Sequence, residues 1–598
     1  MSASVETKRH SLAHVLAQAV QELYPDAKKA IGPDIENGFY FDFDFGDFEL
    51  KEEHLRDIEK KMKNILKQNQ KFERYEMSVA EAIAKAKNVE KNPYKVEIIE
   101  DLVAKEGITT VSYYRNVTQQ GVETYEDLCR GPHVEKLSEI DEQSFALDRI
   151  AGAYWRGDSE RTMLTRIYGL AFDTRDELDA YRKQREEAAK RDHRVLGRKL
   201  KLFTLSDLVG SGLPLLQPNG MIVRREVEEY LWNLHKDRGY LRVWTPHLAK
   251  EDLYVTSGHA GHYLEDMFVV HGGTSKEKFH LKPMNCPHHM QLFADNQFSY
   301  RDMPIRYFEP ATVYRDEKTG QLSGLTRVRA ITQDDGHLFC RVSQIREEVS
   351  SIVSIIKEFY TTFGLMEGYW VSLSVRGEDR SKYLGSDDVW NLAEGALEEA
   401  AQANGLNYRR VEGEAAFYGP KLDFMFKDAI GREWQLATIQ CDFNLPNRFD
   451  LSFVNEQGER EQPVVIHRAI SGSLERFMGI MIEHFAGRFP LWISPEQVRV
   501  VPVGEAFFDY GREVLSVLRA VGMRASIDDS TDNLGKKIRN GEQAHVPYLL
   551  VVGEKEMNAR TVAVRDVRSG NQADESLDAI VSKLVTEREN KSLSSLLA

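Results

Sequence analysis

The chain has 598 residues, which predicts three or four domains because a single hydrophobic core does not organise so long a chain. Hydrophobic residues make up 42% and charged residues 29%, as in folded proteins, and this excludes extensive disorder, collagen-like repeats and a fibrous rod. The four scattered cysteines exclude a disulfide framework, no stretch approaches the roughly 18 consecutive apolar residues of a membrane span, and the N-terminus shows no apolar signal core. We therefore expect a cytoplasmic protein with no membrane association.

The formal net charge is −15, so the chain as a whole repels polyanions. Any nucleic acid must therefore meet positive charge that is gathered locally. Residues 181–201 form one such segment, with nine Lys or Arg against three Asp or Glu. From charge alone, this segment is either a solvated linker helix or a contact for nucleic acid.

The first 175 residues predict an α+β domain. Apolar residues recur at steps of three and four over residues 7–24, which indicates an amphipathic helix. The segment FYFDFDF alternates like a strand, and residues 51–70 predict a second helix. Residues 176–204, which contain the basic segment, then predict a helical connector.

Residues 205–492 predict a large domain in which helices flank an antiparallel sheet, with one long helix at 223–236. The strands expected in it are 306–314, 326–332, 433–443 and 463–470. After residue 492, short strands and helices alternate, which favours a small α/β domain over 493–598. Its expected elements are a strand at 498–503, a helix at 506–521 and a strand at 548–552.

A first group of chemically reactive side chains lies near the N-terminus. His10 and His14 are four residues apart on the first predicted helix and therefore share one face. Cys129 and His133 repeat this spacing in DLCRGPHV, where a Gly-Pro pair predicts a loop. The four side chains suit a zinc site, but buried structural histidines explain the same pattern.

A second group follows the strand expected at 306–314. Arg315 and Glu317 are two residues apart and face the same side, and a polar loop leads back to Arg327. Guanidinium groups bind phosphate oxygens bidentately, so this surface suits a phosphate chain. Exposed arginines in surface ion pairs are the alternative. The sequence has no glycine-rich phosphate loop, so a Walker-type or Rossmann-type site is not supported.

Two of these segments resemble motifs of a known enzyme class. FEPATVYRDE with its returning arginine is similar to motif 2 of the class II aminoacyl-tRNA synthetases, and SGSLERF is similar to motif 3. The resemblance extends nearly end to end with the bacterial threonyl-tRNA synthetases. It rests on seven segments in the same order: RHSLAHVLAQAV, DLCRGPHV, AGAYWRGDS, KPMNCP, TQDDGH, EAAFYGPKLDF and IHRAISGSLERF.

The resemblance implies a multidomain α+β and α/β architecture. Its parts are an N-terminal α+β editing domain (1–175), a linker helix (176–204), a class II antiparallel-sheet catalytic core (205–492) and a C-terminal α/β anticodon-binding domain (493–598). The implied reaction is ATP-dependent activation of L-threonine, with Mg²⁺ accompanying ATP, and transfer to tRNA(Thr). The implied assembly is a homodimer through motif 1, the helix at 223–236 with the strand that ends at Trp244-Thr-Pro.

The family holds a zinc ion in the amino-acid pocket, and the matching ligands here are Cys286, His337 and His467. One thiolate and two imidazoles leave zinc an open position. Threonine fills it through its amino group and hydroxyl, whereas isosteric valine lacks the hydroxyl. The neighbouring His288 and His289, together with Cys340, are alternative ligands.

By similarity, Arg315 binds the α-phosphate of ATP, Glu317 the adenine side, Arg327 the γ-phosphate, and Arg476 one face of the adenine. The remaining positions implied around the adenylate are Gln435, Thr438, Gln440 and Ser473, with Gln333, Asp335, Tyr418 and Lys421 at the aminoacyl part and His259 near the terminal ribose of tRNA. The residues expected to take part in catalysis are Arg315, Arg476, Gln440 and His259. An exposed loop position is the alternative for His259.

The sequence departs from the family at two points. Ile331 stands where the family usually has an aromatic residue that stacks on adenine, and because an aliphatic contact replaces stacking only partly, we expect lower affinity for adenine. Many relatives also begin with a small ubiquitin-like domain. Here the first histidine is already residue 10, so we expect that domain to be absent.

Serine offers zinc the same two polar groups as threonine and lacks only a methyl group, worth about 1–3 kcal/mol of discrimination. The family removes mischarged seryl-tRNA(Thr) at a separate hydrolytic site. The residues that match it are His10, His14, Lys95, Asp127, Cys129 and His133. The related alanyl-tRNA editing module holds a metal with such residues, but the threonyl module works through ordered water, so we expect no metal there.

The C-terminal segment resembles the anticodon-binding domain, which implies that Lys536, Lys537, Arg539 and Arg565 contact unpaired anticodon bases. A surface helix with several cations is the alternative. A catalytically silent paralogue that binds tRNA or messenger RNA as a regulator is the main rival function, and the presence of Arg315, Arg476 and all three zinc positions argues against it. The zinc positions and the two His/Cys clusters also argue against a class II synthetase for serine or proline.

Overall fold

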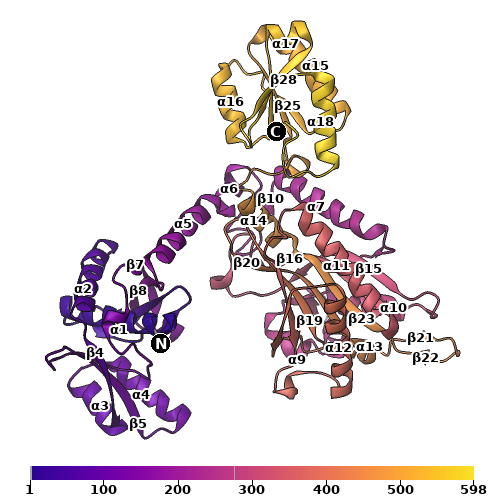
Figure 1. Cartoon of the computed structure of the whole chain (residues 1–598). Helices are drawn as coiled ribbons and strands as arrows, with labels where there is room; N and C mark the ends of the chain where they lie inside the picture. The colour runs from indigo at the N-terminus through magenta and orange to yellow at the C-terminus, as the bar shows by residue number, and fades with distance from the viewer. Residues whose placement is uncertain (1–2, 275–276, 598) are drawn as a thin grey trace. The chain divides into compact units, whose positions relative to one another are not determined.

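A computed structural model describes residues 3–274 and 277–597. The chain divides into two compact units at residue 186, and Figure 1 colours them from indigo to purple and from magenta to yellow. Within the described ranges, no helix is both long enough and apolar enough to cross a bilayer.

The first unit contains two antiparallel sheets. The larger has the strand order β1-β3-β8-β7, with β2 pairing β3. Its strands are β1 (Lys28–Lys29), β2 (Asp34–Ile35), β3 (Gly38–Asp44), β7 (Phe145–Tyr154) and β8 (Met163–Ala171). Helix α1 (Val5–Leu23) begins at Ser4, whose hydroxyl accepts a hydrogen bond from the Thr7 N–H, and packs its apolar face against Phe39 and Phe43 of β3.

The smaller sheet has the order β4-β5-β6 and belongs to the second half of this unit. Its strands are β4 (Lys71–Ser78), β5 (Thr110–Val117) and β6 (Glu123–Leu128), and α3 (Val79–Asn88) and α4 (Pro93–Glu106) pack with it. The side chain of Asn92 caps α4 and so fixes the first turn that carries Lys95. The α+β prediction is confirmed, with the FYFDFDF strand at β3 and the helix of residues 51–70 at α2 (Leu55–Lys67).

The connector is two helices instead of the single one expected. Helix α5 (Arg175–Arg191) ends before Asp192, whose side chain caps α6 (His193–Lys199) by accepting a hydrogen bond from the Arg194 N–H. His193 is buried: its Nδ1 lies 2.6 Å from Oε1 of Glu483, and its Nε2 accepts from the Leu325 N–H at 3.0 Å. Because both ring nitrogens are used, His193 is a packing residue at the start of the second unit.

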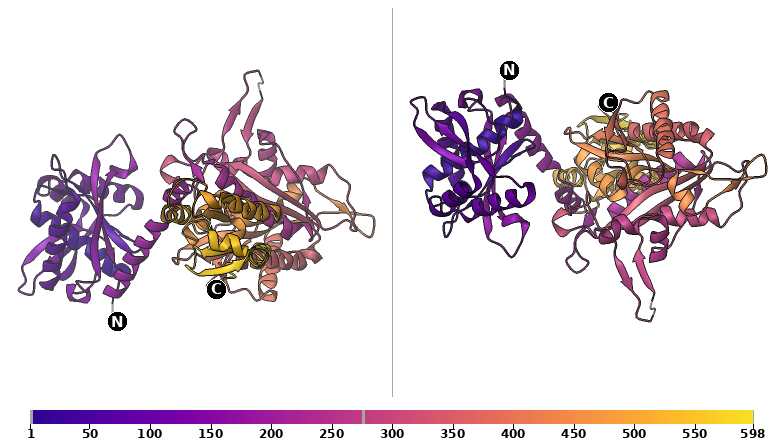
Figure 2. Two further views of the ribbon diagram at one scale, coloured as in Figure 1. Left: turned by 90° about the horizontal axis from the view of Figure 1, so that it is seen from above. Right: turned by 90° about the horizontal axis from the view of Figure 1, so that it is seen from below.

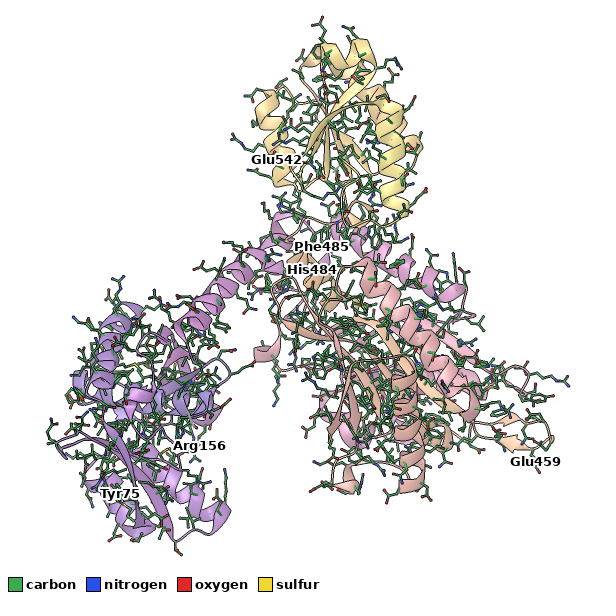
Figure 3. The ribbon with its side chains drawn as sticks, in the orientation of Figure 1. Tyr75, Arg156, Glu459, His484, Phe485 and Glu542 are labelled. Carbon is green, nitrogen blue, oxygen red and sulfur yellow. The ribbon has the colours of Figure 1, made fainter. Side chains whose placement is uncertain are left out.

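The second unit is built around an eight-stranded sheet of order β11-β15-β16-β23-β20-β19-β17-β18, parallel only at its two outermost pairs. The strands are β11 (Leu241–Arg242), β15 (Ile305–Tyr314), β16 (Ala330–Cys340), β17 (Trp370–Val375), β18 (Tyr408–Glu412), β19 (Lys421–Lys427), β20 (Glu433–Asp442) and β23 (Val464–Ser473). A helix-flanked antiparallel sheet was expected here and is confirmed. The hairpin of β21 (Phe453–Val454) and β22 (Arg460–Glu461) projects from this body near Glu459 (Figures 2 and 3).

Alternation along the central strands directs neighbouring side chains to opposite faces of the sheet. Leu338 of β16 and Ile466 of β23 belong to the main core, which also contains α7 (Pro218–Lys236), α11 (Ile345–Thr362), α12 (Asp387–Ala403) and α14 (Leu474–His484). The intervening Phe339 and Val465 instead pack with Met290 and Phe293 of α10 (Cys286–Ala294). The strands therefore present their remaining side chains toward α10.

One strand prediction is wrong in its position. Residues 326–329 form a loop, and β16 begins at Ala330 and continues to Cys340. Val328 within this loop is buried, so its part of the apolar pattern that suggested a strand comes from loop packing.

The C-terminal part forms a sheet of order β25-β24-β26-β27-β28. Its elements are β24 (Val498–Pro502), α15 (Phe508–Ala520), β25 (Ala525–Ile527), α16 (Leu534–Gln543), β26 (Tyr548–Val552), α17 (Glu554–Ala559), β27 (Thr561–Asp566), β28 (Gln572–Ser576) and α18 (Leu577–Glu589). β24 pairs in parallel with β25 and with β26, whereas β27 pairs antiparallel with β26 and with β28. The α/β prediction is therefore confirmed, although β27 and β28 were not expected.

Candidate functional site

Three possible metal ligands meet between α10 and the large sheet. Cys286 is the first residue of α10, and His337 of β16 is directly opposite His467 of β23 in the strand register. One ligand atom from each of the three lies within 4.8 Å of the other two, and all three residues are buried. The structure therefore brings together the residues that the family resemblance implied as a zinc site.

Hydrogen bonds leave one nitrogen of each histidine available. Nε2 of His467 lies 2.9 Å from Oδ2 of Asp442, and Nδ1 of His337 lies 2.8 Å from Nδ1 of His289. The other two nitrogens, Nδ1 of His467 and Nε2 of His337, are buried and have no hydrogen-bond partner among the described residues. Two such nitrogens beside a thiol are a donor set that fits a tetrahedral zinc ion with one open position.

A cavity of about 720 Å³ opens from this cluster. The expected site residues that line it are Arg315, Glu317, Arg327, Gln333, Asp335, Tyr418, Lys421, Thr438 and Gln440, together with Cys286 and His467. An adjoining cavity of about 340 Å³ shares several of these residues and adds Ile331, Gln435, Ser473 and Arg476. The structure thus gathers residues from four strands, from α10 and α14 and from the loop after β15 around two adjoining cavities.

Three arginines converge on these cavities. Burial and the nearby charges of Arg315 and Arg327 lower the pKa of Arg476, whose Nε donates to the Thr326 carbonyl at 3.0 Å. Arg327 forms an ion pair with Glu317, 2.7 Å between Nη2 and Oε2. The concentration of positive charge suits a triphosphate, although Arg327 is engaged by Glu317 in this structure.

The polar residues at the other end of the cavity are held by partners that the sequence did not reveal. Asn285 donates to Oδ2 of Asp335 at 3.0 Å. Asp423 accepts hydrogen bonds from Lys421 at 2.5 Å and from Thr438 at 2.8 Å. Neither Asn285 nor Asp423 belongs to a spacing that would have indicated this role.

His259 lies in a different environment from the exposed loop considered as its alternative. Its side chain is fully buried, its Nδ1 lies 2.7 Å from Oγ of Ser257, and its ring is 5.3 Å from that of Phe417. It is not among the described residues that line the two cavities. A role near the terminal ribose therefore stays a prediction.

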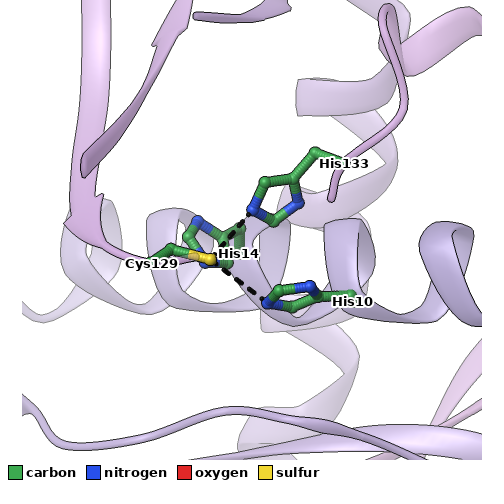
Figure 4. Close-up of side chains that lie close together, drawn as sticks. All are labelled: His10, His14, Cys129 and His133. Atoms are coloured by element: carbon green, nitrogen blue, oxygen red, sulfur yellow. Dashed lines mark hydrogen bonds between the residues drawn. The ribbon is translucent and has the colours of Figure 1, made fainter. Parts of the chain in front are cut away.

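The four His and Cys residues of the first unit also meet (Figure 4). Sγ of Cys129 lies 3.3 Å from Nε2 of His10 and 3.3 Å from Nε2 of His133, and the His14 and His133 rings are 4.3 Å apart. The ring of His133 is also bonded through Nδ1 to Oγ of Ser11, at 3.2 Å. Four potential ligand atoms again lie within 4.8 Å of one another.

A buried ion cluster adjoins these residues. Nζ of Lys95 lies 2.7 Å from Oδ1 of Asp127, and Lys29 approaches the same carboxylate at 3.8 Å while donating to the Glu126 carbonyl. Lys95 and Asp127 line a cavity of about 690 Å³ with His10, His14 and Cys129. Lys29 was not expected, because nothing in the segment DAKKAIGP distinguishes a buried lysine from an exposed one.

Burial keeps this cluster uncharged at neutral pH. It lowers the pKa values of His10, His14 and His133, and it raises the pKa of Cys129 to about 11. The side chains around the sulfur are therefore a neutral thiol and neutral imidazoles. The formal charges of the site belong to the lysines and Asp127.

The C-terminal cations occupy different environments. Lys536 and Arg539 of α16 are exposed, and Arg565 of β27 forms an ion pair with Glu542 at 2.8 Å. Lys537 is only 1% exposed, and its Nζ donates to the carbonyls of Pro502 and Asp528. The expectation that Lys537 contacts anticodon bases is therefore wrong, because its ammonium is used to hold α16 against the sheet.

Comparisons with known families assign the parts of the chain. Residues 268–485 match the tRNA synthetase class II core domain (G, H, P, S and T), residues 497–587 the anticodon binding domain, and residues 115–168 the threonyl and alanyl tRNA synthetase second additional domain. These ranges lie within the expected domains, whose exact boundaries stay predictions. The large sheet and its converging arginines are thus the core of a class II aminoacyl-tRNA synthetase.

Curated relatives narrow the class. The threonine–tRNA ligase of Gloeobacter violaceus is 49% identical over 93% of this chain and 88% of its own length, and that of Thermus thermophilus is 47% identical over 94% and 85%. The crystal structure of the RNA binding domain of threonyl-tRNA synthetase from Cryptosporidium parvum is 36% identical and has a TM-score of 0.62, covering 66% of this chain and 98% of that chain. The chain belongs to the threonine–tRNA ligase family.

The raised pKa of Cys129 predicts slow alkylation at neutral pH. A pKa of about 11 instead of 9.0 leaves roughly a hundredfold less thiolate at pH 7. Iodoacetamide labelling, followed by mass spectrometry of the peptide that contains Cys129, should therefore accelerate about tenfold per pH unit up to at least pH 10. The same peptide in the chemically unfolded chain is the control. A labelling rate that levels off near pH 9 in the folded protein would contradict the prediction.

Proposed function

We propose that the chain is a threonine–tRNA ligase that forms threonyl-adenylate from L-threonine and ATP and transfers threonine to tRNA(Thr). The observation that carries this proposal is the meeting, around two adjoining cavities, of three arginines with a thiol and two histidine nitrogens that have no hydrogen-bond partner among the described residues. A silent paralogue that only binds RNA has no need for both groups, and this disfavours it.

In this proposal the side chains of the cavity position two reactants. Arg315 holds the α-phosphate, Arg327 leaves Glu317 to bind the γ-phosphate, and Arg476 with Ile331 encloses the adenine. The threonine carboxylate attacks the α-phosphorus and pyrophosphate leaves with Mg²⁺, which accompanies ATP. The nucleophile is already an anion, so the protein needs no strong base and contributes alignment and charge stabilisation.

Selection of threonine is proposed to occur at Cys286, His337 and His467. A zinc ion held there would offer its open position to the amino group and hydroxyl of threonine together. The carboxylate of Asp335, 8% exposed at the wall of the same cavity, would accept a hydrogen bond from the amino group that binds zinc. Valine lacks the hydroxyl and would leave part of this polar site unpaired, which costs affinity.

The activation step predicts a defined pattern of ATP–pyrophosphate exchange. Metal-replete protein should support exchange with threonine, more weakly with serine, and not with valine. Removal of zinc, verified by elemental analysis, should reduce threonine-dependent exchange at least a hundredfold, and added zinc should restore it. Exchange that is absent with threonine, or unchanged after zinc removal, is the result that contradicts the proposal.

Correction of serine mischarging is proposed for the first unit. The cavity of about 690 Å³ would admit a seryl ester beside Cys129, His10 and His14, and Lys95 with Lys29 would supply positive charge next to it. We propose that the neutral thiol and imidazoles orient a water molecule for hydrolysis, without a metal ion. The ammonium groups of Lys95 and Lys29 would stabilise the oxyanion that forms.

The hydrolytic site predicts that activation and correction can be separated. The double substitution His10→Ala with Cys129→Ala should leave threonine-dependent exchange within about twofold and allow seryl-tRNA(Thr) to accumulate in aminoacylation assays with serine. Ser138→Ala, on the surface of the same unit, is the control and should not change the level of seryl-tRNA. Failure of the double variant to accumulate seryl-tRNA would remove the editing assignment.

Binding of tRNA(Thr) is proposed to involve two positively charged regions. One is the basic segment of residues 181–201, and the other is the surface of α16 and β27 that carries Lys536, Arg539 and Arg565. Both regions gather positive charge locally, which is needed because a chain with a net charge of −15 as a whole repels a polyanion. The cytoplasm, where tRNA charging takes place, is the proposed location.

A homodimer is proposed on the basis of an apolar segment after α7. Leu241, Trp244 and Leu248 are 56%, 72% and 44% exposed, an unusual density of large exposed apolar side chains. A second copy of the chain would cover them.

A dimer interface at this surface predicts the mass of the protein in solution and the substitutions that should change it. Sedimentation equilibrium should give twice the chain mass of 68.5 kDa. Trp244→Asp should shift micromolar protein toward the monomer, whereas Val89→Asp, at a residue that is 74% exposed in the first unit, should leave the dimer intact. A monomeric unsubstituted chain would exclude the dimer.

A further inference from the structure

Behind His337, on the side away from the cavity, two buried residues continue its hydrogen-bond chain. Nδ1 of His337 lies 2.8 Å from Nδ1 of His289, and Nε2 of His289 lies 2.9 Å from Oε2 of Glu309. The side chains of all three residues are at most 2% exposed. Water therefore does not mediate these contacts, and each must have one donor and one acceptor.

The position of each proton follows from the carboxylate at the end of the chain. Oε1 of Glu309 accepts from the Thr245 N–H at 2.7 Å and lies 3.6 Å from Nζ of Lys282, surroundings that suit an ionised carboxylate. An ionised carboxylate only accepts, so Nε2 of His289 donates. With its single proton on Nε2, His289 has its lone pair on Nδ1, which accepts from Nδ1–H of His337. The lone pair of His337 is consequently on Nε2, the nitrogen without a partner among the described residues.

We propose that His289 and Glu309 are positioning residues that hold His337 in the tautomer whose Nε2 binds the metal ion. This inference rests on the zinc site of the proposed function, and it assigns a role to two residues that do not touch substrate or metal. Histidine ligands generally bind metals more tightly when the second ring nitrogen donates to a fixed acceptor.

Glu309 itself is held in one orientation. Its Oε1 accepts from the backbone N–H of Thr245 at 2.7 Å, and Lys282 lies 3.6 Å from the same oxygen. In a Glu309→Gln variant, the amide oxygen must stay with these donors, so the amide NH₂ faces Nε2 of His289. His289 would then accept at Nε2 and carry its proton on Nδ1, which forces His337 to place its own proton on Nε2. The substitution changes the side-chain volume very little, and it reverses the direction of the hydrogen bonds from residue 309 through His289 to His337.

Four substitutions in the full-length chain test the proposal. Glu309→Gln reverses donor and acceptor in the two hydrogen bonds of His289, and His289→Leu removes both bonds. His289→Gln keeps one donor and one acceptor at this position. His288→Gln is the matched control. His288 is next to His289 on α10 and buried, and it lies outside the cluster of Cys286, His337 and His467, so it is not one of the grouped ligands. Thermal unfolding of each variant establishes that it is folded.

The measurement is the affinity for zinc alone, by competition with a chromophoric chelator, together with the absorption bands of the Co²⁺-substituted protein. Glu309→Gln and His289→Leu should weaken zinc binding about ten- to a hundredfold and alter the Co²⁺ bands. His289→Gln should stay within about threefold and His288→Gln within about twofold of the unsubstituted chain.

The outcomes distinguish the inference from the function on which it rests. Zinc affinity and Co²⁺ bands that are unchanged in both Glu309→Gln and His289→Leu would overturn the positioning role. An equal loss in His289→Gln and His289→Leu would overturn it too, because it would point to packing instead of proton placement. If the unsubstituted chain does not bind zinc, the zinc site of the proposed function fails as well.

Discussion

The ability of Cys286, His337 and His467 to bind a cation depends on which nitrogen of each histidine is already hydrogen bonded. In water the two tautomers of imidazole interconvert freely, but in this fold Asp442 engages Nε2 of His467 and His289 engages Nδ1 of His337. The two remaining nitrogens have no hydrogen-bond partner among the described residues, and both histidines cluster with Cys286. A buried polar atom without a partner costs about 1–3 kcal/mol, so two of them beside one thiol are difficult to explain as a packing arrangement. A bound cation removes that cost.

The sheet provides this geometry through register and alternation. His337 and His467 are direct neighbours on antiparallel strands, so their side chains lie on the same face at close distance. The residues on either side of them, such as Leu338 and Ile466, point into the core that contains α11. The packing that stabilises the sheet therefore also fixes the direction of the two imidazoles. In the proposed function, substrate selection and fold stability therefore depend on the same two strands.

The sequence predicted best those features that depend on short-range patterns. The period of two located β15, β20 and β23, and the period of three and four located α1 and α7. It failed where burial came from loop packing, as at Val328, which imitated a strand. Spacing also could not show that Lys537 is buried while Lys536 beside it is exposed. Partners distant in sequence, such as Glu309 for His289, become visible only when β15 and α10 are placed together.

In the proposed function, the activation cavity of the second unit and the editing cavity of the first unit discriminate against amino acids by different free-energy differences. Rejecting valine depends on a missing polar contact, whereas rejecting serine depends on a single methyl group worth about 1–3 kcal/mol, too little for accurate decoding. Hydrolysis at a second cavity does not need a stronger contact with threonine. It needs a neutral site that admits a water molecule and positive charge where an oxyanion develops. In the proposed function, the buried Cys129 and the histidines supply the first, and Lys95 and Lys29 beside Asp127 supply the second.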